Sequence, residues 1–103
     1  MGKYDYVIVG GGTAGCILAN RLTQCGKYNV LLLEAGGPPK SPWIKIPAGF
    51  SKLLTNKTYN WRFESFPEVV TNNRVISIPR GKGLGGSTLI NGMIYVRGQP
   101  DDY

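Results

Sequence analysis

Two glycine-rich stretches hold the residues whose types and spacing point to chemistry. The first is Gly10-Gly11-Gly12-Thr13-Ala14-Gly15, which fits a GxGxxG pattern. In such a turn the first glycine allows a tight bend, the second lets the backbone approach a pyrophosphate, and the third lets a helix pack closely on a strand. The pattern predicts a site for two phosphates at the N-terminus of a helix, where unpaired N–H groups point outward.

A carboxylate follows at the position that this interpretation requires. Glu34 ends an apolar run, nineteen residues after Gly15. There it can accept hydrogen bonds from the hydroxyls of a ribose, and it repels a 2′-phosphate, which disfavours NADP. The residues alone leave NAD and FAD open. They also leave open an α/β protein with ordinary glycine turns and a surface glutamate.

The glycines of the first stretch need a strand before them and a helix after them. Tyr4 to Val9 is short, β-branched and aromatic, which predicts a strand buried on both faces. Apolar residues recur at helical spacing from Thr13 to Cys25, and Gly26 predicts a left-handed stop. Val30 to Leu33 predicts a second, parallel strand. Residues 4–34 therefore predict a right-handed βαβ unit, and the expected fold class is α/β with a Rossmann-like dinucleotide-binding unit.

The next stretch, residues 37–79, loses this periodicity. We expect it to be an ordered excursion, because a disordered segment would leave many aromatic side chains in water. Arg74 to Pro79 alternates weakly and predicts a short strand that ends at Pro79. The aromatic residues of the excursion are Trp43, Phe50, Tyr59, Trp61, Phe63 and Phe66.

The second glycine-rich stretch spans residues 80–98 and begins Arg80-Gly81-Lys82-Gly83-Leu84-Gly85-Gly86. Ser87 or Thr88 is expected to cap a short helix whose first N–H groups are free. A plain NAD-binding unit does not require a second glycine-rich turn. A larger cofactor does, because its flavin end needs a second cradle.

These motifs resemble the N-terminal portion of the glucose-methanol-choline (GMC) oxidoreductases, flavoproteins that oxidise alcohols. The sequence is especially similar to the branch that contains choline dehydrogenases and alcohol dehydrogenases. The resemblance is most specific from Arg80 to Gly98. The matching segments are Tyr4 to Gly15, Leu31 to Gly37, Tyr59 to Trp61, Asn72 to Arg74 and Arg80 to Gly98.

The resemblance implies FAD as the cofactor and gives residues roles in binding it. Gly10 to Gly15 would hold the pyrophosphate and Glu34 the adenosine ribose. Arg80 to Ser87 would run beside the phosphates and the ribityl chain. Asn91 to Ile94 would lie against the flavin ring, where backbone N–H groups stabilise the negative charge that develops as hydride arrives at N5. The expected cofactor-binding residues are Gly10, Gly12, Thr13, Ala14, Gly15, Glu34, Ala35, Trp61, Arg80, Gly81, Gly83, Gly85, Gly86, Ser87, Asn91, Gly92, Met93 and Ile94.

The chain departs from the family pattern at one position and ends before another part of it. Some members attach the flavin through a histidine, but this chain has no histidine and Ile90 stands at that position, so we expect non-covalent FAD. The family's catalytic pair, a histidine base with a histidine or asparagine partner, lies far downstream in longer chains. Residues 1–103 are therefore expected to be the N-terminal part of an FAD-binding domain in a larger two-domain fold. The substrate domain is absent, and no catalytic residue or metal site is expected.

An isolated chain of this kind should leave part of its sheet uncovered. The family fold places later segments beside the first two strands. Without them the chain is expected to be marginally stable or prone to aggregate, and to show no turnover. The strand side chains expected to be partly exposed are Val7, Val9, Leu31 and Leu33.

Composition narrows the function classes further. Lys and Arg outnumber Asp and Glu by 12 to 6, but the charges are scattered and no nucleic-acid-reading motif is present, so no nucleic-acid partner is expected. Cys16 and Cys25 would lie on opposite faces of the predicted helix and could not bridge each other. The basic residues that fit either a phosphate-bearing ligand or a solvated face are Arg74, Arg80, Lys82 and Arg97.

The sequence also bears on location and partners. No apolar run approaches the roughly 20 residues that span a bilayer, and Asp5 follows Met1 too closely for a signal peptide. We therefore expect no membrane-spanning segment and a cytoplasmic protein. The expected partners are a small-molecule alcohol in the full-length enzyme and the rest of its FAD and substrate domains. The alternative to an FAD-binding segment of an alcohol-oxidising enzyme is a non-catalytic dinucleotide-binding module.

Overall fold

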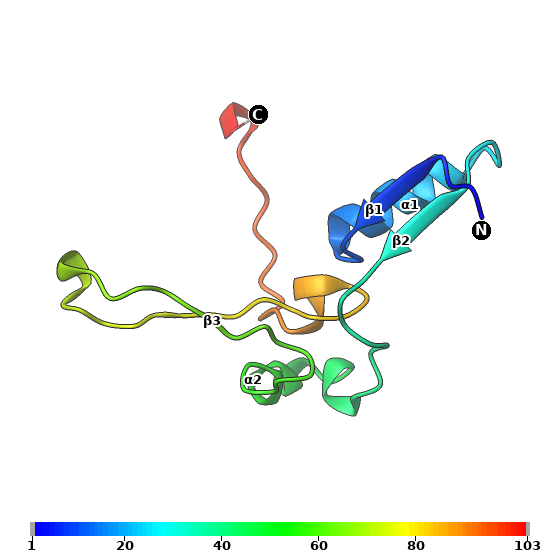
Figure 1. Cartoon of the computed structure of the whole chain (residues 1–103). Coiled ribbons are helices and arrows are strands. Elements are labelled where there is room, and N and C mark those ends of the chain that lie inside the picture. The colour runs from blue at the N-terminus through cyan, green and yellow to red at the C-terminus, as the bar shows by residue number, and fades with distance from the viewer. Residues whose placement is uncertain (1, 103) are drawn as a thin grey trace.

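A computed structural model describes residues 2–102 of the chain. Strand β1 (Tyr6–Val9) pairs in parallel with strand β2 (Val30–Leu33), with Tyr6 opposite Val30 and Val9 opposite Leu33. Helix α1 (Thr13–Thr23) connects the two strands and lies behind them in Figure 1. The N-terminal part of the chain is therefore a strand, a helix and a parallel strand in the predicted order.

Helix α1 ends at Thr23, two residues before the predicted end at Cys25. The Thr23 hydroxyl donates to the carbonyl of Ala19, and the Gly26 N–H donates to the carbonyl of Thr23. Gly26 has a φ of +68°, the left-handed conformation expected of a residue that terminates a helix. Cys25 therefore lies in the turn after the helix, which corrects its predicted place on a helical face, and both cysteines are free thiols.

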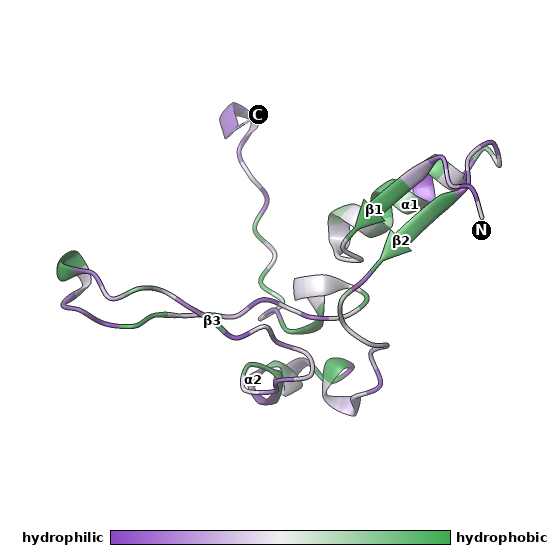
Figure 2. Ribbon diagram, in the orientation of Figure 1, coloured by the Kyte–Doolittle hydropathy of each residue, from purple (hydrophilic) through white to green (hydrophobic). Residues whose placement is uncertain are grey.

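The prediction that β1 is buried on both faces is wrong for this chain. Val7 is 56% exposed and Val9 is 84% exposed, because α1 covers only one face of the strand pair. Figure 2 shows both strands as strongly hydrophobic. Leu33 is also exposed and Leu31 is half-buried. The four side chains are thus at least partly uncovered, as expected for an isolated chain.

The excursion after β2 contains short helical elements. Two 3-10 turns, η1 (Pro42–Ile44) and η2 (Pro47–Gly49), each begin at a proline, whose fixed φ suits the first position of a helix. Helix α2 (Phe50–Leu53) follows directly. The core of the chain lies here and not under the sheet. It consists of the buried side chains Leu53, Tyr59, Leu89 and Ile90, with Ile44 packed against them.

Strand β3 (Phe63–Glu64) pairs antiparallel with β4 (Ser77–Ile78), and the 3-10 turn η3 (Val69–Thr71) lies between them. These segments extend away from the rest of the chain in Figure 1. β4 ends before Pro79 as predicted, but it begins later than Arg74. Both the backbone N–H and the Nε of Arg74 donate to the carbonyl of Thr71, which holds Arg74 in the turn.

The second glycine-rich stretch contains the 3-10 turn η4 (Gly86–Leu89), and η5 (Pro100–Asp102) lies near the C-terminus. The prediction that Ser87 or Thr88 caps this turn is wrong, because the cap residue is Gly85, with a φ of +109° and no side-chain cap. The Thr88 hydroxyl donates to the Gly85 carbonyl, and the Ser87 hydroxyl accepts from the Gly81 N–H. Within residues 2–102, no helix is long and apolar enough to cross a membrane.

Candidate cofactor-binding site

The two glycine-rich stretches meet backbone to backbone. The Gly85 N–H donates to the Gly11 carbonyl across 2.7 Å, and Gly12 forms a parallel bridge with Gly85. A Cβ added to Gly86 would lie 2.8 Å from the Gly12 Cα, closer than real side chains approach. Contact at this distance requires glycine at position 86, so part of the glycine richness of the second stretch serves its contact with the first.

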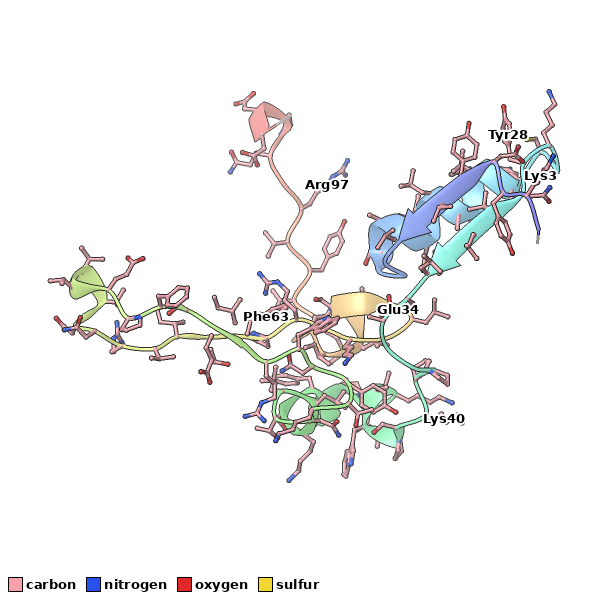
Figure 3. The ribbon with its side chains drawn as sticks, in the orientation of Figure 1. Lys3, Tyr28, Glu34, Lys40, Phe63 and Arg97 are labelled. Atoms are coloured by element: carbon pink, nitrogen blue, oxygen red, sulfur yellow. The ribbon has the colours of Figure 1, made fainter. Side chains whose placement is uncertain are left out.

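Glu34 lies where the two stretches meet. Its Oε2 accepts a hydrogen bond from the Gly11 N–H (2.7 Å), and its Oε1 accepts from the N–H groups of Gly36 (2.9 Å) and Gly83 (3.1 Å). Figure 3 shows Glu34 beyond the end of β2, beside the segment that carries η4. One carboxylate thus binds the first glycine-rich stretch, the end of β2 and the second glycine-rich stretch.

These hydrogen bonds change the acidity of the carboxyl group. The bond from the Gly36 N–H contributes most to lowering the pKa of Glu34 below its ordinary value of 4.5, with partial burial opposing it. The bonds from Gly11 and Gly83 lower the pKa further. Donors aimed at a carboxylate stabilise its charged form, so these hydrogen bonds favour the ionised form of Glu34.

A cavity of about 910 Å³ opens beside this junction, at the N-terminus of α1. Gly12 is the N-cap of the helix and makes no side-chain cap, so the first backbone N–H groups of the helix are not bonded by a cap side chain. No acidic residue lies in the first turn to repel an anion. The predicted cofactor residues that line this cavity are Gly10, Gly12, Thr13, Ala14, Gly15, Glu34, Ala35, Trp61, Arg80, Gly81, Gly86 and Ser87.

A second cavity, of about 450 Å³, adjoins the first and shares Arg80 and Ser87 with it. Asn91 and Gly92 line this second cavity, together with residues of α2 and its end. Their neighbours Met93 and Ile94 line neither cavity and are exposed. Most of the predicted residues thus line one of the two cavities, whereas Met93 and Ile94 do not.

Gly83 and Gly85 line neither cavity, although both were predicted to bind the cofactor. The N–H of Gly83 donates to Glu34, and that of Gly85 donates to Gly11. A Cβ on Gly83 would lie 2.9 Å from a methyl group of Leu89. In this chain the two glycines hold the second stretch against the first.

Two side chains that contact Trp61 were not among the predicted cofactor-binding residues. Lys82 places its Nζ 4.6 Å from the centroid of the Trp61 ring, a cation–π distance. Phe63 stacks on Trp61 with ring centroids 5.8 Å apart and an interplanar angle of 6°. Trp61 is one of the predicted cofactor-binding residues, but nothing local in the sequence indicates which side chains contact it. The cavity-lining residues that sequence reasoning missed are Ile8, Val9, Leu18, Leu33 and Phe63.

Comparison with known proteins decides the family. The GMC oxidoreductase family model matches residues 4–103. The chain belongs to the GMC oxidoreductase family. This match covers both glycine-rich stretches and the excursion between them, and it confirms the resemblance seen in the sequence.

Individual relatives agree with this assignment. The chain is 50% identical over 100 residues to an oxygen-dependent choline dehydrogenase of Photobacterium profundum, covering 97% of this chain and 18% of that protein. It is 49% identical over 100 residues to an alcohol dehydrogenase [acceptor] of Pseudomonas putida, with the same coverage. Pyridoxine 4-oxidase from Mesorbium loti superimposes with a TM-score of 0.91 at 40% identity, covering 97% of this chain and 19% of that one. The chain thus spans about 18% of the length of the curated relatives it matches.

Proposed function

We propose that this GMC oxidoreductase chain is the N-terminal part of a Rossmann-like FAD-binding domain in an enzyme that oxidises the CH–OH group of an alcohol. The observation that carries the proposal is the meeting of two glycine-rich stretches around Glu34, beside a large cavity at a helix N-terminus. A helix N-terminus with free N–H groups suits a pyrophosphate. A second cavity that shares Arg80 and Ser87 extends the site in the way that a flavin dinucleotide needs.

Different residues of the chain would bind the pyrophosphate, the ribose and the flavin ring of FAD. The N–H groups at Thr13 and Ala14 would donate to the pyrophosphate, and the Arg80 guanidinium would neutralise its charge. Glu34 has two oxygens with about four acceptor positions, of which three are used by backbone N–H groups. One position on Oε2 is left for a ribose hydroxyl. Asn91 and Gly92 in the second cavity would lie toward the flavin ring.

The bound FAD would supply the acceptor for the hydride that leaves the alcohol carbon. The base that takes the alcohol proton would come from the remainder of the enzyme, because this chain contains no histidine. The alcohol and the remaining domains are thus the proposed partners. The role of residues 2–102 is to bind and orient the cofactor.

The attachment of FAD is proposed to be non-covalent. Ile90 is aliphatic, only 4% exposed, and packs in the core with Leu53, Tyr59 and Leu89. It offers no atom that could form a bond to the flavin. A residue so placed would contact the cofactor only by packing.

The test is to purify the protein from the complete open reading frame that contains these residues. We expect flavin absorbance bands, FAD in the supernatant after acid precipitation, and alcohol-dependent reduction of a dye. The 103-residue chain alone should give no turnover in the same assay. Colour that stays with the precipitate would contradict non-covalent binding. Release of NAD in place of FAD, or turnover by the short chain, would contradict the proposed function itself.

Gly12→Ala is expected to weaken FAD binding with little effect on the fold. A Cβ at Gly12 meets only the Gly86 Cα, at 3.7 Å, within ordinary contact distance, and Gly12 lines the first cavity. We expect the Kd for FAD to rise by about tenfold or more, which is about 1.4 kcal/mol, while the thermal midpoint of the apoprotein stays near wild type. Flavin fluorescence titration and thermal unfolding measure the two quantities.

Gly15→Ala is the comparison for this prediction. A Cβ at Gly15 would overlap the Gly10 carbonyl oxygen, so this variant should lose stability as well as affinity. If both variants lowered the thermal midpoint equally, or if Gly12→Ala bound FAD as tightly as wild type, the role given to Gly12 would be wrong.

A further inference from the structure

Asn60 is the buried polar side chain of the part of the chain that the structure describes, with 2% exposure. Its side chain makes three hydrogen bonds, and each of them is to the main chain. Its Nδ2 donates to the Leu54 carbonyl at 2.6 Å, and its Oδ1 accepts from the N–H groups of Arg62 (2.9 Å) and Arg80 (3.0 Å). One amide therefore connects the end of α2, the residue after Trp61 and the start of the second glycine-rich stretch.

Two of these partners, Leu54 and Arg80, and Trp61, which precedes the third partner Arg62, line the two cavities. Arg80 lines both cavities, Leu54 lines the second, and Trp61 lines the first. Backbone bonds on either side of Asn60 join the same segments, since Trp61 N–H donates to the Arg80 carbonyl and Lys82 N–H donates to the Tyr59 carbonyl, each at 2.9 Å. The amide thus lies behind the wall that the cavities share, without lining either of these two cavities.

The bond to Arg62 has a second effect. Arg62 has a φ of +56°, a left-handed conformation that is uncommon for residues other than glycine. An asparagine oxygen that accepts from the N–H two residues later stabilises a turn of this kind. Trp61 lies between these two residues, so the turn fixes the direction in which its ring leaves the backbone.

From these contacts we propose that Asn60 is a positioning residue of the cofactor site. Its side-chain amide sets the relative placement of Arg80, Trp61 and the end of α2, and through them the environment of the bound flavin. Both ends of the amide are needed, because one donates and the other accepts. This inference rests on the proposed function, since the cavities matter here as parts of an FAD site.

The test uses the full-length holoenzyme with Asn60→Asp and Asn60→Ala. Asn60→Asp keeps the acceptor for Arg62 and Arg80 but replaces the donor to Leu54, whereas Asn60→Ala removes both. We expect Asn60→Asp to raise the Kd for FAD by about tenfold, and Asn60→Ala by more. Both variants should alter the visible circular dichroism of the bound flavin and lower kcat for the alcohol more than they change KM.

Asn56→Asp is the matched control. The Asn56 Oδ1 accepts from the Thr58 N–H at 2.8 Å, a local turn whose two residues line neither FAD cavity. We expect wild-type FAD affinity and flavin dichroism from this variant. If Asn60→Ala fails to fold, Asn60→Ala combined with Arg62→Gly gives the same test, because glycine takes a φ of +56° without strain.

The outcomes separate this inference from the proposed function. A wild-type protein that binds no FAD overturns the proposed function. A wild-type holoenzyme whose folded Asn60 variants keep the FAD affinity, the dichroism and the ratio of kcat to KM overturns the positioning role alone. A lower thermal midpoint with those three quantities unchanged would make Asn60 merely structural, and it also overturns the inference.

Discussion

Gly36→Ala is expected to abolish FAD binding by the full-length protein and to destabilise it by about 3 kcal/mol or more. A Cβ at Gly36 would overlap the backbone of Lys82 and Gly83, atoms that cannot rotate away. Space could be made only by moving the second glycine-rich stretch. That movement would break the bond from the Gly83 N–H to Glu34 and separate the two stretches. Flavin content after purification and chemical denaturation of the apoprotein measure the two effects.

The neighbouring Gly37 provides the matched control. A Cβ at Gly37 meets nothing within 4 Å, and the residue is exposed. Gly37→Ala should therefore keep full flavin content and change the free energy of unfolding by less than about 0.5 kcal/mol. Equal behaviour of the two variants would mean that the contact between the two stretches does not govern the site.

Glu34→Gln is expected to have the second largest effect. A carboxylate accepts on both oxygens, but an amide must turn its NH₂ group toward Gly11 or toward Gly36 and Gly83. In either orientation the NH₂ group of the amide faces a backbone N–H group, and two donors cannot form a hydrogen bond. A hydrogen bond to a charged group contributes about 1.5–3 kcal/mol, so we expect a loss of about 3 kcal/mol in unfolding free energy and a large rise in the Kd for FAD. Glu64→Gln, at an exposed position in β3, should leave both unchanged.

The same carboxylate predicts a dependence on pH. Because its folded pKa lies below the ordinary value of 4.5, Glu34 binds fewer protons in the folded state than in the unfolded state. Its contribution to stability is therefore present above pH 4.5 and is lost as the pH falls through the lower, folded pKa. Unfolding free energies measured across this range should converge for wild type and Glu34→Gln at acid pH. If the difference in unfolding free energy between wild type and Glu34→Gln stayed constant with pH, the charge of Glu34 would not be what holds the two glycine-rich stretches together.

The sequence was sufficient to predict the strand–helix–strand unit, and many of the residues that it assigns to the cofactor line the first cavity. A GxGxxG turn between an apolar strand and an amphipathic helix contains local information, since each element has its own periodicity. Gly26 marked the turn after the helix correctly, although the helix ends earlier, at Thr23. The Thr23 hydroxyl competes for the last carbonyls of the helix, and such competition is difficult to predict from spacing.

The contact between the two glycine-rich stretches could not be predicted from local sequence periodicity. It depends on bonds between residues far apart in the chain, such as Gly85 to Gly11 and Gly83 to Glu34. A glycine pattern shows that the backbone approaches something closely, but not what it approaches. The assignment of Gly83 and Gly85 to the cofactor stays a prediction, and the structure adds that their N–H groups donate to Glu34 and Gly11.

The two-sided burial that the pattern of β1 predicts is absent here for a physical reason, and the partial exposure expected of an isolated chain is observed. Its apolar sequence indicates cover on both faces, whereas residues 2–102 place only α1 against it. The sequence pattern suits a larger fold than the one these residues form. This agrees with a chain that spans about 18% of its curated relatives.

The most direct test of the account is an experimental structure of the full-length protein with FAD bound. We predict that the pyrophosphate lies in the first cavity within hydrogen-bond distance of the N–H groups at Thr13 and Ala14. Glu34 should keep its bonds to Gly11 and Gly83 while accepting one ribose hydroxyl. A pyrophosphate outside this cavity, or a Glu34 that releases both glycine-rich stretches to bind the ribose, would contradict the account.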